Sequence, residues 1–395
     1  MSQLVSPPLS LYIHLPWCVR KCPYCDFNSY ALNGELAETQ YVAALDSDLA
    51  AQAAEVSGRG VISIFLGGGT PSLFSPDAIG RILESARRHL TVAADAEVTM
   101  EANPGTIERG RFEGYRAAGL TRVSLGAQSF SESRLKALGR IHSSDETRRA
   151  ASELHAAGLP NFNLDLMYAL PEQDVAAALY DVEEALRLKP AHVSHYQLTI
   201  EQGTVFAGSP PALPDDDIAA EMLDICRDRL AADGFAQYEV SGYALSDRRC
   251  RHNLNYWTFG DYVGIGAGAH GKVSLPASGV FRTQQTREPR RYLANPTGQL
   301  VRRRVPAADL PFEFMLNALR LVEGFDLAEF SARTGLPWAA MEPRMNELQD
   351  RGLIELSATR CRASPRGLQF LNDLLLWFLA ETPKTTGAFG LSTAL

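Results

Sequence analysis

The sequence lacks several features that mark whole classes of protein. No apolar run reaches the roughly 18–20 residues that span a bilayer, and the stretch from Met1 to Pro8 has neither a basic nor an apolar segment, so we expect no signal peptide. Six cysteines in 395 residues are too few for a disulfide scaffold, and no internal repeat is visible. Basic residues are scarcer than acidic ones, 38 against 46, which argues against a nucleic acid as the principal partner. The remaining composition, 46% hydrophobic and 21% charged, is that of a globular protein with two or three domains.

Three of the six cysteines lie close together near the start of the chain. Cys18, Cys22 and Cys25 have the spacing C-x3-C-x2-C. Three thiolates on one short loop can hold three irons of a [4Fe–4S] cluster and leave the fourth iron open, and an open metal position is typical of a site that does chemistry. The spacing and its aromatic flanks resemble the radical S-adenosylmethionine (SAM) superfamily, in which the open iron chelates the amino and carboxylate groups of SAM. The resemblance implies a [4Fe–4S] cluster and SAM as cofactors.

Two other interpretations of these cysteines are weaker. Zinc takes four ligands, usually as two separated pairs, and the sequence has no second pair. A dithiol formed by Cys22 and Cys25 would resemble a thioredoxin motif but would leave Cys18 without a role. The other three cysteines are scattered and are interpreted as buried or spare thiols: Cys226, Cys250 and Cys361. Free thiols and an oxygen-sensitive cluster both favour a cytoplasmic location.

Short β-rich runs alternate with helical patterns over the first 200 residues. Six strand-then-helix units predict a parallel sheet and the α/β class, with strands at Leu9–His14, Val61–Leu66, Glu97–Glu101, Thr121–Leu125, Asn161–Leu166 and His192–Ile200. Polar residues collect where these strands end, and the carboxyl ends of the strands of a β/α barrel converge on one mouth. The pattern therefore favours a barrel over an open sheet. It matches the partial (β/α)6, TIM-like barrel of the radical SAM superfamily.

The rest of the chain predicts smaller units. A Pro-rich segment over 208–217 reads as a surface connection or lid. Helical patterns begin at residues 311 and 338, a small hairpin is expected over 353–366, and an apolar helix over 368–379, which suggests a mainly helical, winged-helix-like domain. We therefore expect these domains: a barrel over 1–215, an extension over 216–305, a C-terminal helical domain over 306–380 and a flexible tail over 381–395.

A glycine motif, Gly67-Gly-Gly-Thr-Pro-Ser72, directly follows the second predicted strand. Glycines have no side chain to keep a ligand away from backbone N–H and C=O groups, although tight turns use glycine as well. One strand after the cysteine loop, the motif resembles the radical SAM segment that binds the amino group of SAM. The resemblance implies these SAM-binding residues: Tyr12, Tyr24, Gly68, Gly69, Thr70, Glu101, Gln128, Arg140 and Asp165. Carboxylates can accept from ribose hydroxyls or from the amino group, and a guanidinium can meet the SAM carboxylate; capping and core packing are the alternative roles.

A third group of residues runs from Cys250 to Trp257 and is followed by a glycine-rich stretch that ends at His270. His252 and His270 are candidate axial ligands for a haem iron, and Tyr256 and Trp257 offer flat faces for a macrocycle. From the chemistry alone, histidines near aromatic residues are more often satisfied structural residues. The glycine series lacks a Rossmann unit, so dinucleotide binding is not expected. Clustered arginines suit haem propionates or a solvated basic surface: Arg287, Arg290, Arg291 and Arg302 to Arg304.

Several of these runs together resemble one family over nearly the whole chain. These runs are the motif His-Asn-x-x-Tyr-Trp and the segments Tyr12–Cys18, Phe65–Ser72, Ser124–Phe130, His195–Glu201 and Phe312–Arg320. Together they resemble the HemW haem-chaperone family of oxygen-independent coproporphyrinogen III oxidase-like proteins. This resemblance implies a protein that binds haem and delivers it to acceptor apoproteins. It also implies haem contacts from His252, Asn253, Tyr256 and Trp257.

The alternative is an oxygen-independent coproporphyrinogen III dehydrogenase, which resembles the chain over the barrel. Such enzymes use a reduced cluster to cleave SAM to a 5′-deoxyadenosyl radical for oxidative decarboxylation. They carry a fourth cysteine two positions past the third, where this chain has Phe27, and a longer N-terminal arm. We therefore expect no such activity, and the sequence leaves open whether the protein is an enzyme at all. A homodimer and a peripheral membrane contact through acceptors also stay open, whereas nucleic-acid binding by the C-terminal domain is not expected.

Overall fold

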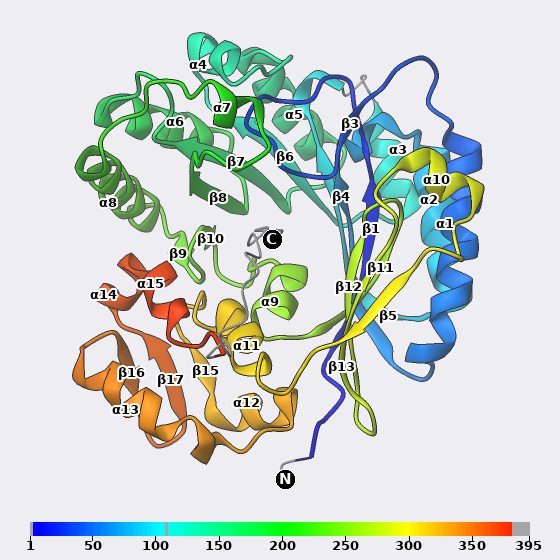
Figure 1. Ribbon diagram of the computed structural model, residues 1–395. Helices are drawn as coiled ribbons and strands as arrows, with labels where there is room; N and C mark the ends of the chain where they lie inside the picture. The colour runs from blue at the N-terminus through cyan, green and yellow to red at the C-terminus, as the bar shows by residue number, and fades with distance from the viewer. Residues whose placement is uncertain (1–2, 107–109, 381–395) are drawn as a thin grey trace.

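The computed structural model describes residues 3–106 and 110–380, and a twelve-stranded sheet runs through it (Figure 1). Six neighbouring strands at its centre are parallel, as the sequence predicts. These strands are β1 (Leu9–Leu15), β4 (Gly60–Gly68), β5 (Thr91–Ala102), β6 (Arg122–Gln128), β7 (Phe162–Tyr168) and β8 (His192–Gln197). The α/β class is confirmed.

Helices follow each of these strands and cover the outer face of the sheet (Figure 1). They are α1 (Glu38–Ala53), α2 (Pro76–His89), α3 (Arg111–Ala118), α4 (Glu132–Ala137), α5 (Ser144–Ala156), α6 (Val175–Arg187) and α8 (Asp216–Ala232). The short helix α7 (Val205–Gly208) lies beside Pro23 instead, where the Phe206 N–H donates to the Pro23 carbonyl. Local sequence sets several of their starts: the Ser75 hydroxyl accepts from the Ala78 N–H, and Ser143 forms a capping box with Glu146. Helix α8 packs against α6, and the domain limit at residue 215 stays a prediction.

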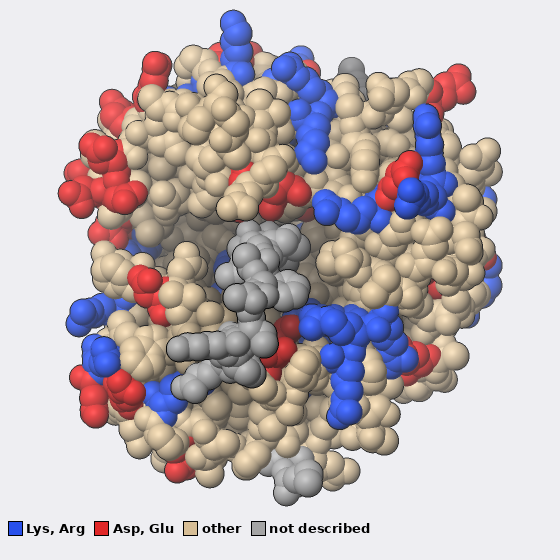
Figure 2. Space-filling view, in the orientation of Figure 1, with Lys and Arg blue, Asp and Glu red and all other residues tan. Residues whose placement is uncertain are grey.

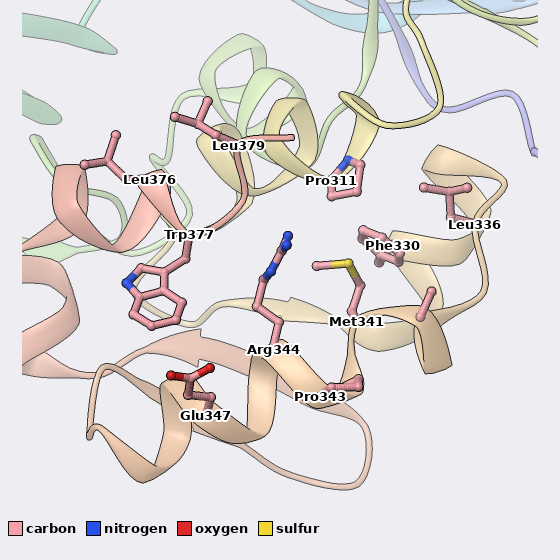
Figure 3. A pocket seen from close by; sticks show the side chains of 11 residues that line it. Pro311, Phe330, Leu336, Met341, Pro343, Arg344, Glu347, Leu376, Trp377 and Leu379 are labelled. Atoms are coloured by element: carbon pink, nitrogen blue, oxygen red, sulfur yellow. The ribbon is translucent and has the colours of Figure 1, made fainter. Parts of the chain in front are cut away.

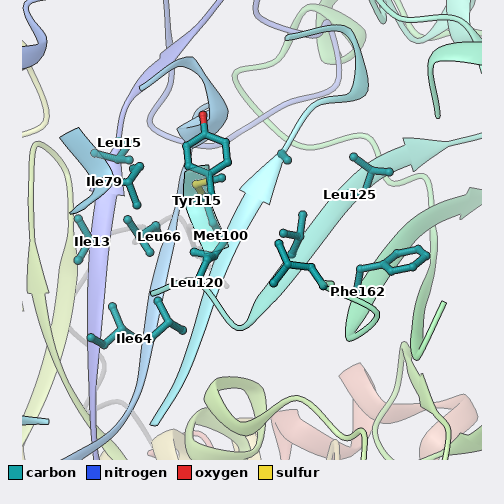
Figure 4. Packing of buried hydrophobic residues seen from close by; sticks show 14 of the residues in the cluster. Ile13, Leu15, Ile64, Leu66, Ile79, Met100, Tyr115, Leu120, Leu125 and Phe162 are labelled. Carbon is teal, nitrogen blue, oxygen red and sulfur yellow. The ribbon is translucent and has the colours of Figure 1, made fainter. Parts of the chain in front are cut away.

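The main core lies between the parallel strands and the helices (Figure 4). Ile13 and Leu15 of β1 lie beside Leu66 of β4, and Ile79 and Tyr115 of the covering helices lie over the same cluster. Because side chains alternate along a strand, the residues between these apolar ones face the other side of the sheet. That inner face carries the polar candidates.

Strand β11 (Asp261–Ile265) lies in a glycine-punctuated stretch for which the sequence predicts no strand. It pairs in parallel with β1, and antiparallel strands β12 (His270–Leu275), β13 (Gly279–Gln284) and β14 (Val301–Arg304) continue the sheet. At the other end, β10 (Gly242–Ala244) and β9 (Ala236–Gln237) join β8. Helix α9 (Arg251–Trp257) connects β10 to β11 and contacts β1 and β4; helix α10 (Pro289–Ala294) packs on α1.

The C-terminal part has its own apolar core and packs below the barrel in Figure 1. It contains α11 (Leu310–Ala318), α12 (Leu327–Thr334), α13 (Glu342–Asp350) and a three-stranded antiparallel sheet of β15 (Phe325–Asp326), β17 (Arg360–Ala363) and β16 (Ile354–Leu356). The single apolar helix predicted over 368–379 is wrong: two short helices, α14 (Pro365–Gln369) and α15 (Leu371–Leu376), meet at Phe370, whose φ and ψ are −112° and 39°. The predicted tail over 381–395 lies outside the described residues.

Figure 2 shows a hollow at the centre of this face, between the barrel above and the C-terminal part below. Across residues 3–106 and 110–380, no helix combines the length and the apolarity that a membrane span requires.

Candidate functional site

The three clustered cysteines lie on one tightly held loop between β1 and α1. Short strands β2 (Trp17–Cys18) and β3 (Tyr30–Ala31) pair in parallel and close the loop. All three thiols are free and half-buried. Burial raises the pKa of Cys18 and of Cys25, so metal binding there has to displace protons.

Arg140 reaches this loop from the segment after β6. Its Nη1 donates to Cys22 Sγ at 3.7 Å and its Nη2 donates to the Gly126 carbonyl at 2.8 Å. Its Nε is buried and has no hydrogen-bond partner among the described residues. Three free thiols on one loop fit a [4Fe–4S] cluster with one open iron, and the unused guanidinium N–H beside them fits a carboxylate ligand.

The glycine motif packs against the cysteine loop. A Cβ on Gly68, whose φ is +112°, would lie 2.4 Å from the His14 ring, and one on Gly69 would lie 2.6 Å from the Trp17 carbonyl oxygen. The N–H groups of Gly68, Gly69 and Thr70 already donate to Glu101 Oε2, the Leu15 carbonyl and the Trp17 carbonyl. The turn can therefore offer a ligand its carbonyl oxygens, which suit an amino group.

Two carboxylates face the same end of the barrel. Burial first, and the charge of Asp165 second, raise the pKa of Glu101 to about 7. Asp165 accepts from Asn163 Nδ2 at 2.7 Å and from Ser124 Oγ at 3.1 Å, and burial raises its pKa as well. These partners fix both carboxylates in position while part of each acceptor capacity stays open to a ligand.

Gln128 ends β6 in an unusual backbone conformation. Its φ is +67°, and the pairing of β6 with β7 shifts register between Leu125 and Gln128. Left-handed backbone at a non-glycine residue costs roughly 1–3 kcal/mol and clusters at functional sites. The Tyr196 hydroxyl donates to Gln128 Oε1 at 2.7 Å, which holds the amide at the inner face.

His14 belongs to this end of the barrel, although sequence reasoning missed it. The Asn28 carbonyl lies 3.0 Å from His14 Nε2, so Nε2 donates, and Nδ1 accepts from the Tyr12 hydroxyl at 2.6 Å. The imidazole thereby ties β1 to the cysteine loop. Its position two residues after Tyr12, on the same strand face, is the signal that could have found it. Tyr24, whose neighbours include Arg140 and Cys22, packs beside Phe206, with ring centroids 6.4 Å apart.

The His-Asn-x-x-Tyr-Trp motif forms helix α9 toward the amino ends of the strands. Glu97, which contacts this helix, precedes Glu101 by four positions on β5. Four residues of a strand span about 13 Å, so Glu97 lies that far from Glu101 along β5. Glu97 Oε1 lies 3.1 Å from His252 Nδ1, and Cys250 Sγ lies 3.0 Å from the same nitrogen. The imidazole stacks on Phe65 at 4.2 Å and is only 5% exposed.

Burial and hydrogen-bond partners decide the protonation state of His252. Burial lowers the pKa of His252, so the imidazole is neutral, and its contact with the Glu97 carboxylate places the proton on Nδ1. Nε2 then carries a lone pair, which is the form that binds a metal. The donor atoms of Glu97, Cys250 and His252 lie within 4.8 Å of one another, but the guanidinium of Arg122, whose charge acts on Glu97, opposes a free cation among them.

The other predicted haem residues divide between two sides of α9. Tyr256 lies one turn after His252, with ring centroids 6.2 Å apart, and is half-buried. Trp257 lies under the guanidinium of Arg320 at 4.2 Å, and the Asn253 side chain hydrogen-bonds to Tyr238. The structure therefore brings His252 and Tyr256 together but places Asn253 and Trp257 elsewhere.

A separate cavity of about 690 Å³ lies in the C-terminal part (Figure 3). The Arg344 side chain points into it between Trp377 and Met341. The described residues that line it include no cysteine and no histidine. This cavity therefore has none of the ligand chemistry of the barrel.

Comparisons with known proteins agree with this geometry. Residues 12–183 match the family model "Radical SAM superfamily", and residues 305–370 match the "HemN C-terminal domain". A solved structure described as coproporphyrinogen III oxidase (HemN) from Escherichia coli, a radical SAM enzyme, has a TM-score of 0.79 at 21% identity and covers 94% of this chain and 90% of that chain. The fold and the cysteine loop thus define a radical SAM protein.

Curated relatives narrow the class to one family. "Heme chaperone HemW" of Escherichia coli is 50% identical over 380 residues, which cover 95% of this chain and 99% of the relative. The protein of the same name from Haemophilus influenzae is 44% identical with the same coverage. "Radical S-adenosyl methionine domain-containing protein 1, mitochondrial" of Bos taurus is 35% identical, covering 94% of this chain and 87% of that protein. The chain belongs to the heme chaperone HemW family.

Proposed function

We propose that the protein is a haem chaperone, which binds haem and delivers it to acceptor apoproteins, and that it carries a [4Fe–4S] cluster and SAM in its barrel. The observation that carries this proposal is the 50% identity with a heme chaperone over 95% of the chain. The intact motif on α9 supports the haem role, and the three free thiols beside Arg140 support the cofactors. A homodimer and a membrane contact through acceptors stay predictions.

The residues at the carboxyl end of the barrel have distinct roles in this proposal. Cys18, Cys22 and Cys25 hold the cluster, which when bound supplies an open iron that chelates the amino and carboxylate groups of SAM. Arg140 donates its unused Nε–H to the SAM carboxylate, and the carbonyls of the glycine turn accept from the amino group. Ligand hydroxyls donate to Glu101 and Asp165. Flanking contacts come from Tyr12, Tyr24, Gly68, Gly69, Thr70 and Gln128.

We assign the haem contacts to His252, Asn253, Tyr256 and Trp257. His252 presents the neutral imidazole that an axial ligand requires. In the structure that imidazole is held by Glu97 and Cys250 and stacked on Phe65. Nε2 can meet a haem iron only when the ring turns out of these contacts, so haem binding has to move α9.

A haem titration of anaerobically reconstituted protein tests this proposal. We expect a saturable change in the Soret band and, for His252→Ala, binding weaker by roughly tenfold or more, since an iron ligand is lost. The control is His155→Ala, which changes an exposed histidine of α5, a helix outside the barrel, and should bind like the wild type. A wild-type protein without saturable binding would refute the haem role, and normal binding by His252→Ala would refute the ligand assignment.

The same preparation separates the chaperone from the dehydrogenase. Incubated with SAM, a reductant and coproporphyrinogen III, it is expected to form no protoporphyrinogen, because Phe27 stands where those enzymes have a fourth cysteine. Formation of protoporphyrinogen would overturn the chaperone proposal.

Glu101 gives SAM binding a pH dependence. The pKa of about 7 means that its carboxyl gains charge between about pH 6 and about pH 8. An ionised carboxylate accepts hydrogen bonds more strongly, so the affinity for SAM should rise over this range and then level off. Equilibrium dialysis against SAM across the range checks this. In Glu101→Gln the rise attributed to this carboxyl should disappear, and identical pH profiles for both proteins would contradict its role.

A further inference from the structure

A chain of buried hydrogen bonds crosses the inside of the barrel from the proposed SAM site to the haem motif. Asp165 Oδ1 accepts from Asn163 Nδ2 at 2.7 Å, and Asn163 Oδ1 lies 2.6 Å from His192 Nδ1. On the other side of the imidazole, Nε2 lies 2.9 Å from the Tyr238 hydroxyl. The Tyr238 hydroxyl in turn hydrogen-bonds to the Asn253 side chain.

Each bond in this chain has a fixed direction. Asp165 accepts from Asn163 Nδ2 and from Ser124 Oγ, so Asn163 turns its NH2 group toward Asp165 and its carbonyl oxygen toward His192. His192 Nδ1 must then donate, which leaves Nε2 to accept from the Tyr238 hydroxyl. The Tyr238 oxygen has only its lone pairs left and accepts from Asn253. All donors therefore point toward Asp165, and such chains strengthen one another.

The burial pattern suits a connection with two accessible ends. His192 and Tyr238 are each 1% exposed and Asn163 is 3% exposed, whereas Asp165 and Asn253 are half-buried. Burial lowers the pKa of His192 far below its usual value, so the imidazole stays neutral and keeps this proton order. A ligand can therefore change the chain only at one of its ends.

We propose that this chain couples SAM binding to haem binding, with His192 as the central positioning residue. The proposal rests on the proposed function. When ligand hydroxyls donate to Asp165, they compete with Asn163 for its oxygens and weaken the ordered chain. The hold of Tyr238 on Asn253 then loosens, and α9 is freer to move. SAM thereby favours release of His252 toward haem.

A pair of matched variants tests this coupling. Tyr238→Phe removes the hydroxyl that links His192 to Asn253 and keeps the ring. Tyr243→Phe is the control, because the Tyr243 hydroxyl is also buried but has no hydrogen-bond partner among the described residues. Haem titrations of reconstituted protein, with and without saturating SAM, give the ratio of the two dissociation constants for each protein.

We expect SAM to tighten haem binding of the wild type and of Tyr243→Phe by roughly 5- to 150-fold, the usual range of coupling between sites. Tyr238→Phe without SAM should already bind haem about as tightly as the wild type with SAM, so its ratio should fall to about one. A gain of affinity is a result that a merely structural role of the hydroxyl would not produce. By reciprocity, haem should tighten SAM binding by the same factor.

The alternative outcomes are distinct. If wild-type protein binds haem but SAM leaves the affinity unchanged or weakens it, the coupling is refuted and the proposed function stands. If SAM tightens binding equally in Tyr238→Phe and in the wild type, this hydrogen-bond chain is not the connection. A wild type that binds no haem refutes the proposed function and the coupling together.

Discussion

Replacing Cys18, Cys22 and Cys25 together by serine is expected to abolish the iron–sulfur chromophore. Thiolates are the ligands that hold such clusters, and the cysteine loop supplies all three of them from one segment. Iron and acid-labile sulfide should fall from about four atoms of each per chain to background. Visible absorbance of anaerobically reconstituted protein, with iron and sulfide analysis, measures the change.

The control for this prediction is the double variant Cys226→Ser, Cys361→Ser. Both thiols are buried in apolar cores, and burial raises the pKa of each to about 12, so neither is a thiolate donor. This variant should keep its cluster if it folds, as circular dichroism will show. Zinc in place of iron in the wild type, or a retained chromophore in the triple variant, would contradict the cluster assignment.

Replacing Asp261 by alanine is expected to lower the free energy of unfolding by about 3–5 kcal/mol. The carboxylate is completely buried and lies 2.8 Å from Lys272 Nζ and 2.9 Å from Arg59 Nη1. It also accepts from Ser274 N at 2.7 Å. Burial lowers the pKa of Lys272 to about 8 even with this partner present. Without Asp261 the ammonium group loses its counter-ion inside the protein.

Urea titrations followed by circular dichroism measure this loss. Asp326→Ala is the control, because the Asp326 side chain is half exposed and pairs with Arg360 at 3.4 Å; it should cost at most about 1 kcal/mol. A loss of less than about 1 kcal/mol for Asp261→Ala would contradict the role of the buried ion pair.

The six parallel strands and the cysteine loop were predictable because their signals are local. Each strand is a short apolar run followed by a helical pattern, and Cys18, Cys22 and Cys25 need only their spacing. Gly67 to Thr70 also directly follow a strand. The positions of Glu101, Gln128 and Asp165 at strand ends then place them at one mouth by geometry alone.

The remaining features depend on contacts between distant residues. Strand β11 is only five residues long, and its place in the sheet comes from its pairing with β1, in which Leu9 lies opposite Asp261. The burial of His252 depends on Glu97, 155 positions earlier in the chain. The break of the last helix at Phe370 has no proline or glycine to announce it. No local sequence pattern predicts any of these three features.

The outer edge of the large sheet has a consequence for self-association. Strand β14 is its terminal strand in the described part of the chain, and all four of its residues are exposed. Figure 2 shows basic side chains gathered in the region that β14 occupies in Figure 1. Arg302 is tied to Glu55 at 2.5 Å and lies over Phe281, while Arg303 and Arg304 extend the row. Two copies aligned edge to edge would bring like charges together, so this rim resists strand-by-strand aggregation.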